Sequence, residues 1–239
     1  LFTTDPTTTE SRNIYDPLPA GIPLTLNDLH SNSKMRGTEH TFQADYTTPL
    51  SKNQTLNAGA KFIGRRNTSD SKFYNIINGK EVFDSNNSVN YKNTQSILAS
   101  YIEYKLTLGK FSAKAGARYE HTWENVEFIL GKGDDFKKNY GNLVPSASFT
   151  YNIGAAVNVG VNYNMRISRP GISFLNPYID RSTPTVLTYG NPNLDVEESH
   201  KVNLVFNAFT PKFMINLTLG EAFANNQIEQ YSFMDANGI

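Results

Sequence analysis

Residues 143–168 read LVPSASFTYNIGAAVNVGVNYNMRIS, and the alternation in this stretch decides the fold class. From Val157 onward every second residue is apolar, and the residues between are asparagine, glycine, arginine or serine. The run from Leu143 to Ile153 alternates in the same way. Because successive side chains of a β-strand point to opposite faces of its sheet, this period of two predicts two strands joined by a short turn at 154–156.

The same alternation recurs along most of the chain, whereas helical spacing is nearly absent. No stretch of twelve residues places its apolar side chains at the 3.6-residue spacing of a helix. Six further runs alternate, at residues 38–50, 55–75, 96–108, 111–128, 199–210 and 213–230. We therefore expect an all-β chain of about eight long strands.

Strand length and loop pattern separate a membrane β-barrel from a soluble β-sandwich, which alternation alone does not. Sandwich strands are usually about 5–6 residues long, whereas the stretch from Phe111 to Trp123 would cross about 30 Å at a tilt of ~40°. The connections at 51–54, 109–110, 154–156 and 211–212 are tight, and those at 78–94, 131–141 and 169–198 are long. The expectation is an antiparallel up-and-down transmembrane β-barrel with tight turns in the periplasm and long loops outside. A soluble β-rich binding module is the alternative.

Two connections allow finer predictions. Asn78-Gly79 is a signal for a type I′ hairpin, so the strand that begins near 55 should continue past the bilayer, turn there and return. Across the turn at 109–110, charge pairing predicts that Glu103 lies opposite Lys114 or Arg118, because Lys105 directly opposite Lys114 would be an unfavourable like-charge pair.

Composition excludes several functional classes. The chain has 239 residues, 22 Lys plus Arg against 22 Asp plus Glu, and no cysteine. Zero net charge argues against a nucleic-acid partner, and the lack of cysteine excludes disulfides and thiolate metal sites. Neither the four histidines nor the serines form a metal or hydrolase motif. We expect no enzyme activity, no cofactor and no metal, and we interpret the Glu120 and Glu124 pair as lumen charges rather than a glycosidase dyad.

The polar face of the predicted strands supplies the candidate binding residues. We expect Arg65, Glu103, Arg118 and Glu120 to face the lumen, where they are candidates for contact with a ligand or with a domain inside the barrel. Arg166 faces the same way. The alternative, which the sequence favours, is that these charges form a structural ladder of salt bridges along the inner wall. The apolar faces should point to outer-membrane lipid.

Several segments resemble the barrel of TonB-dependent outer-membrane receptors, and most closely the outer-membrane protein β-barrel family. The resemblance covers nearly all of the chain from about residue 35. Its specific part is RISRP at 166–170, FLNPY at 174–178, YGNPNL at 189–194 and EESH at 197–200. GARYE at 116–120, LVPS at 143–146 and DYTTPL at 45–50 are similar to further strands of that family. The motif-loop residues are expected to shape the outer loop rather than to contact ligand: Arg166, Arg169, Pro170, Asn176, Pro177, Gly190, Asn191 and Pro192.

The resemblance implies a 22-stranded barrel, closed by an N-terminal plug domain and driven by a periplasmic energy-coupling protein, in the outer membrane of a Gram-negative bacterium. We expect residues 1–33 to be an extracellular loop or leader and residues 34–239 to be a barrel segment that lacks the plug. The functional hypothesis is the barrel wall of a TonB-dependent importer of an unidentified ligand. The rival is a non-transporting barrel that acts as a scaffold, an adhesin or a secretion-complex subunit. A surface lipoprotein or other complex subunits are further possible partners.

Overall fold

Nine long strands form one antiparallel sheet in a computed structural model that describes residues 2–15, 27–131, 133–177, 179–183 and 186–234. Neighbouring strands follow the chain order: β1 (Phe2–Asn13), β2 (Asp28–Ser51), β3 (Gln54–Ile77), β4 (Lys80–Leu108), β5 (Phe111–Leu130), β6 (Phe136–Asn152), β7 (Val157–Ser168), β10 (Glu197–Phe209) and β11 (Met214–Asn225). Between β7 and β10 lie a short helix, α1 (Ile172–Leu175), and a small two-stranded sheet of β8 (Asp180–Thr183) and β9 (Val186–Thr188). Among the described residues, no helix has the length and hydrophobicity of a membrane-spanning segment.

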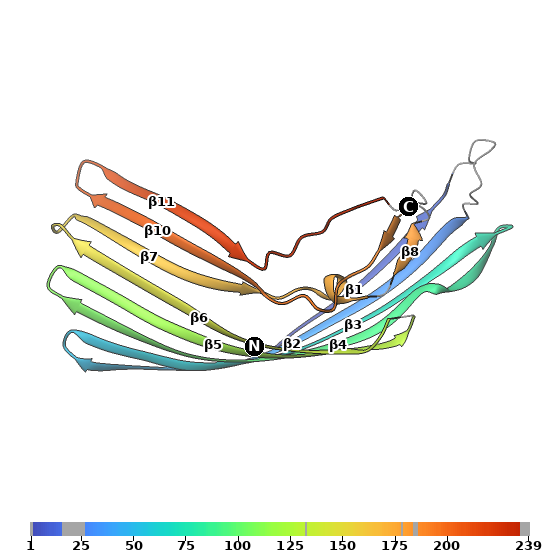
Figure 1. Ribbon diagram of the computed structural model, residues 1–239, viewed down its shortest axis with the longest axis horizontal. Helices are drawn as coiled ribbons and strands as arrows, with labels where there is room; N and C mark the ends of the chain where they lie inside the picture. Colours follow the sequence, from blue (N-terminus) through green and yellow to red (C-terminus); the bar gives the residue numbers. More distant parts are fainter. Residues whose placement is uncertain (1, 16–26, 132, 178, 184–185, 235–239) are drawn as a thin grey trace.

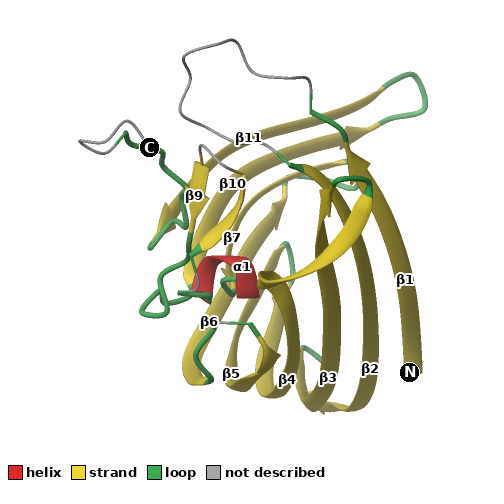
Figure 2. Cartoon of the chain, turned by 90° about the vertical axis from the view of Figure 1, so that its right-hand side faces the viewer, coloured by secondary structure: helices red, strands yellow, loops and turns green. Residues whose placement is uncertain are grey.

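The sheet is a curved wall (Figures 1 and 2). β1 and β11 are its two edges, and the sheet does not close between them. The segment that carries α1 lies on the concave side of the wall in Figure 2. This architecture confirms the predicted all-β, antiparallel, up-and-down topology of an outer-membrane barrel, with nine strands rather than about eight in the main sheet.

The strands are longer than their alternating runs suggested. β2 and β3 have 24 residues each and β4 has 29. The predicted hairpin at Asn78-Gly79 is present: both residues have positive φ, 51° and 75°, and Ile77 pairs with Lys80 across them. The connection at 78–94 is therefore a two-residue turn between strand extensions and not a long loop.

The prediction of a leader is wrong for residues 2–13, which form β1 and pair with residues 29–40 of β2. Residues 28–33 likewise belong to β2. Residues 16–26 of that leader lie outside the described part of the chain. The prediction failed because FTTDPTTTESRN is polar on both faces and contains Pro6. This sequence forms a strand through its pairing with β2 over its whole length.

The register between β4 and β5 is also different from the prediction. Lys105 lies directly opposite Lys114, so Glu103 is not the direct partner of Lys114 or Arg118. The turn sets this register: Leu108 pairs with Phe111 around Gly109 and Lys110, and Gly109 has the positive φ of 56° that a two-residue hairpin turn needs. The charge of Lys114 is compensated by a diagonal neighbour instead, since Lys114 Nζ lies 3.1 Å from Glu103 Oε2.

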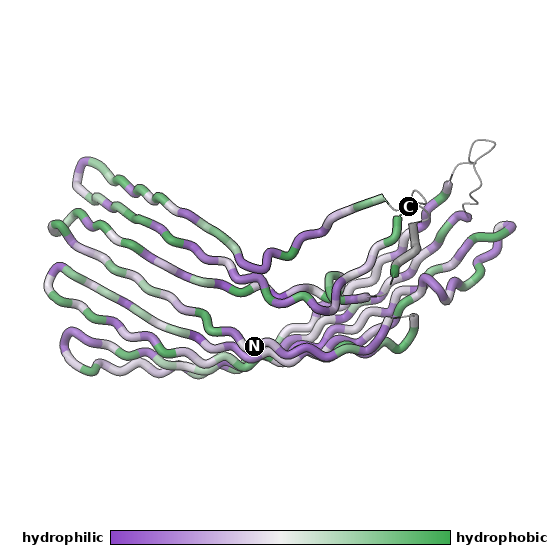
Figure 3. The backbone as a smooth tube through the Cα atoms, viewed as in Figure 1, coloured by the Kyte–Doolittle hydropathy of each residue, from purple (hydrophilic) through white to green (hydrophobic). Residues whose placement is uncertain are grey.

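The two faces of the wall differ in polarity, and Figure 3 shows the resulting alternation along several of the strands. The concave face carries rows such as Glu39, Arg65, Gln95 and Glu124, which are successive register partners across β2 to β5. The convex face carries the opposite residues, of which Phe42, Phe62 and Leu98 form one exposed apolar row. Exposed apolar side chains on one face of a long-stranded sheet are typical of a surface that contacts lipid.

Candidate functional site on the concave wall

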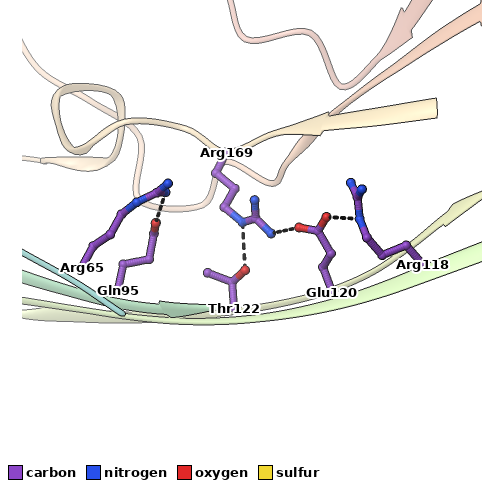
Figure 4. A network of polar contacts seen from close by, with 6 residues as sticks. All are labelled: Arg65, Gln95, Arg118, Glu120, Thr122 and Arg169. Carbon is purple, nitrogen blue, oxygen red and sulfur yellow. Dashed lines mark hydrogen bonds and ion pairs between the residues drawn. The ribbon is translucent and has the colours of Figure 1, made fainter. Parts of the chain in front are cut away.

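Arg169, the first residue after β7, fastens the α1 segment to the wall (Figure 4). Its Nη2 atom lies 2.6 Å from Glu120 Oε2, and its Nε donates a hydrogen bond of 2.8 Å to Thr122 Oγ1. Glu120 also accepts a 2.6 Å hydrogen bond from Arg118 Nε. The Glu120 and Arg169 side chains are only 10% and 15% exposed, so this ion pair is largely shielded from water. We call Arg118, Glu120, Thr122 and Arg169 the latch.

A second cluster lies beside the latch on the same face. Arg65 Nε is 2.6 Å from Glu39 Oε2, and Arg65 Nη1 donates a 3.1 Å hydrogen bond to Gln95 Oε1. These three residues come from β2, β3 and β4 and occupy one row of the register. Ion pairing along the wall accounts for the immediate contacts of Arg65.

A cavity of about 740 Å³ lies between these clusters and the start of the α1 segment. Arg65, Gln95 and Glu124 line it from the strands, and Arg169 and Pro170 line it from the segment. Side chains of both charges therefore surround one space on the concave wall. A polar cavity of this size has room for a small ligand or for side chains of another domain.

Two buried acceptors in this cavity lack a hydrogen-bond partner among the described residues. Asn93 donates a 3.0 Å bond to Glu124 Oε1, which leaves Glu124 Oε2 and Asn93 Oδ1 without one. Glu124 is 4% exposed and Asn93 is 5% exposed. Since a buried acceptor without a donor is costly, these atoms fit an additional donor group in the cavity, such as a hydroxyl, an ammonium or a guanidinium.

Two backbone hydrogen bonds, which we call the backbone clamp, hold the two halves of the motif loop together. The Gly190 N–H donates to the Asn176 carbonyl at 2.7 Å, and the Asn191 N–H donates to the Phe174 carbonyl at 2.6 Å. A Cβ at Gly190 would collide with the Phe174 carbonyl, so only glycine allows this approach. The buried Pro170, Leu175 and Val196 complete the segment. These contacts are what a shape-determining loop requires, while its role remains a prediction.

The remaining predicted site residues lie apart from the latch. Glu103 binds Lys114 and accepts a 3.0 Å hydrogen bond from Asn57. Arg166 is exposed and forms no ion pair within the part of the chain that the structure describes. Pro177 and Pro192 are partly exposed and lie in the loop on either side of the backbone clamp. The structure thus brings together Arg118, Glu120 and Arg169, with Arg65 across the cavity.

Sequence analysis missed several members of the site. Thr122, Gln95 and Asn93 were not singled out, although Thr122 and Gln95 share the polar-face parity of Glu120 and Arg65. That parity was a usable signal. In contrast, no local pattern indicates that Arg169 reaches Glu120, 49 residues away. No three His, Asp or Glu side chains of the described residues are arranged to hold a metal ion.

The fold and the site define a class of protein: a segment of a transmembrane β-barrel wall with a lipid-exposed convex face and a polar concave face. The model of the outer membrane protein beta-barrel family matches residues 4–239, and the chain belongs to that family. Its location is the outer membrane of a Gram-negative bacterium. A comparison with curated protein sequences finds no match.

Solved structures with a similar fold include two transporters and an uptake receptor. They include the ferric citrate transporter FecA (TM-score 0.63, 12% identity, 100% of this chain and 33% of that one). The ferric yersiniabactin uptake receptor FyuA from Yersinia pestis is similar as well (TM-score 0.59, 15% identity, 93% of this chain and 35% of that one). The copper transporter OprC is a third similar structure (TM-score 0.62, 8% identity, 92% of this chain and 34% of that one). The chain spans about a third of the length of these structures. At such identities the likeness shows the fold.

Proposed function

We propose that this chain is part of the barrel wall of a TonB-dependent importer and that its concave site contacts a plug domain or the imported ligand. In this arrangement the tight turns face the periplasm, and the long strand ends and the α1 segment lie toward the outside. Residues 34–239 belong to the barrel segment, and β1 is an additional strand of the same wall. The plug domain and a periplasmic energy-coupling protein are the expected partners.

The observation that carries this proposal is the cavity on the concave wall. Its buried acceptors, Glu124 Oε2 and Asn93 Oδ1, lack donors among the described residues. A buried acceptor without a donor costs about 1–3 kcal/mol. A plug side chain or a ligand that supplies donors would remove this cost.

The similar structures suggest which kind of nutrient the barrel would import. They are a ferric citrate transporter, a ferric yersiniabactin uptake receptor and a copper transporter. A protein of this fold that imports a metal or a metal chelate through a polar lumen is consistent with the charged concave wall. Direct catalysis is not part of the proposal.

Energy-dependent uptake tests the proposal. Cells that lack the gene of the full-length protein would be complemented with the wild type or with Glu124→Gln, and supplied with ⁵⁵Fe as ferric citrate, ⁵⁵Fe with a siderophore, or copper. We expect accumulation of one of these nutrients to depend on the gene and to stop when the proton-motive force is dissipated. Photo-cross-linking of the full-length protein to the energy-coupling protein is the accompanying measurement. Normal uptake in the deletion strain together with no cross-link would favour the scaffold, adhesin or secretion-subunit alternative.

A further inference from the structure

On the convex face of the wall, opposite the latch, one row of residues marks the upper edge of the apolar surface. Trp123, Ser96, Gly64 and His40 are successive register partners on the convex face of β5, β4, β3 and β2. From this row down to the row of Phe111, the convex faces of these four strands carry no Asp, Glu, Lys or Arg. The row of Trp123 therefore marks the upper edge of the surface that contacts hydrocarbon.

Basic residues begin immediately above this edge. Arg66 lies in the next convex row, opposite Thr38 and Thr94. Arg36 lies one row higher and Lys34 one row above that. We call Lys34, Arg36 and Arg66 the basic patch. Because successive rows on one face are two residues apart, the patch begins about 6–7 Å along the strand from the apolar edge.

The charges of the basic patch are not balanced within the described chain. Its three side chains are exposed, and none of them forms an ion pair with a described residue. Asp70 is the direct register partner of Lys34, although its ion pair is with Lys72 at 3.5 Å, and Glu127 pairs with Lys92 at 3.2 Å. These two acids face five basic side chains, Lys34, Arg36, Arg66, Lys72 and Lys92. The patch therefore presents an excess of positive charge at the edge of the lipid-contacting face.

The surface beneath these charges is hollowed. A cavity of about 600 Å³ is lined by Arg36, Arg66 and His40 together with the hydroxyl-bearing residues Thr38, Thr68, Thr94 and Ser96. Guanidinium groups and hydroxyls all donate hydrogen bonds, and guanidinium forks match the geometry of phosphate oxygens. The cavity thus combines the charge and the donors that a phosphate group requires.

We propose that the basic patch binds the phosphate of an outer-leaflet lipid whose acyl chains cover the apolar face below it. The position supports this source of phosphate: the patch continues directly from a lipid-contacting surface, at the depth where a bilayer places its headgroups. Charge complementarity supports it too, because basic residues next to a membrane attract anionic lipid. The site lies on the face opposite the latch, so it stands whether or not the barrel transports a ligand.

Lipid binding to the purified full-length protein tests this site. The protein would be reconstituted in phosphatidylcholine vesicles that contain one part in ten of bisphosphorylated lipid A, and bound lipid A would be counted by native mass spectrometry. Arg36→Gln/Arg66→Gln removes two charges from the patch. Lys52→Gln/Lys110→Gln removes two charges from the tight turns at the other end of the strands and is the matched control. Heat-modified electrophoretic migration confirms folding of each variant.

We expect Arg36→Gln/Arg66→Gln to bind lipid A about 25-fold more weakly, because each basic residue near an anionic lipid surface contributes about fivefold. The control should keep wild-type binding, and Arg36→Lys/Arg66→Lys, which keeps both charges but loses the guanidinium forks, should bind more tightly than the glutamine variant. Raising salt from 50 to 500 mM NaCl should weaken wild-type binding, which tests the charge term even if the glutamine variant misfolds. The proposal is overturned by unchanged binding in the folded glutamine variant, an equal loss in the control, or salt-independent binding. It is also overturned if dephosphorylated lipid A binds as well, or if inorganic phosphate alone binds as tightly.

Discussion

The latch offers the most quantitative prediction, because one carboxylate holds two arginines of different exposure. Replacing Glu120 by Gln removes the partner of Arg169, whose side chain is 15% exposed, and of Arg118, whose side chain is 46% exposed. Breaking a buried ion pair by removing one partner costs about 3–5 kcal/mol, whereas an exposed pair contributes at most about 1 kcal/mol. Since Arg169 keeps its hydrogen bond to Thr122, we place the loss of unfolding free energy at about 3 kcal/mol, nearly all of it from Arg169.

The assay is urea unfolding of the full-length protein in phosphatidylcholine vesicles, for Glu120→Gln, Arg169→Gln and the double variant. Arg118→Gln is the matched control, with an expected loss below about 1 kcal/mol. The two latch substitutions should be non-additive, with a coupling energy of about 2 kcal/mol, because each removes the same contact. A loss below about 1 kcal/mol for Glu120→Gln, or strict additivity of the pair, would refute the assignment of the latch.

Three further predictions concern single positions and are read by the same unfolding assay, with hydrogen exchange added for the loop. Val161→Lys on the convex face of β7 should cost about 2–4 kcal/mol near mid-bilayer, and Asn162→Lys on the concave face should cost far less; equal costs would contradict the face assignment. Gly190→Ala should break the backbone clamp and speed amide exchange in the motif loop, while Gly154→Ala, whose Cβ would meet no atom within 4 Å, should not; protection retained in Gly190→Ala would argue against the clamp. Lys105→Glu should stabilise the β4–β5 hairpin by about 0.2–1 kcal/mol by placing an acid opposite the lysine on β5, and a loss of stability would show that the register is different.

Much of the fold was predictable because the sequence signals of a membrane strand and of a tight turn lie in residues that are close together in the chain. The alternation from Val157 onward identified β7, and Asn78-Gly79 identified a hairpin, since each signal depends on residues that are neighbours in the chain. β1 was missed because its sequence has no apolar face, and its strand conformation comes from pairing with β2. A strand stabilised by its neighbour leaves no periodic signal of its own.

The errors in register and site have related causes. Charge pairing suggested that Lys105 and Lys114 would avoid each other, but a two-residue turn constrains backbone geometry more strongly than exposed lysines repel. Parity correctly placed Arg118 and Glu120 on one face, and it extends to Thr122. The contact of Arg169 with Glu120 depends on how the α1 segment folds over the concave wall, which no local pattern encodes.

Labelling from the lipid phase tests the central claim, that the convex face contacts lipid and the concave face encloses the lumen. The chain has no cysteine, so each single cysteine substitution adds one thiol to it. Neighbouring residues on opposite faces form matched pairs: Val161 with Asn162, Leu106 with Lys105, and Leu217 with Asn216. In the full-length protein embedded in a bilayer, a membrane-dissolved thiol probe should label cysteine at Val161, Leu106 and Leu217 and spare the other three. Labelling of the Asn162, Lys105 and Asn216 positions instead, or equal labelling within the pairs, would contradict the account.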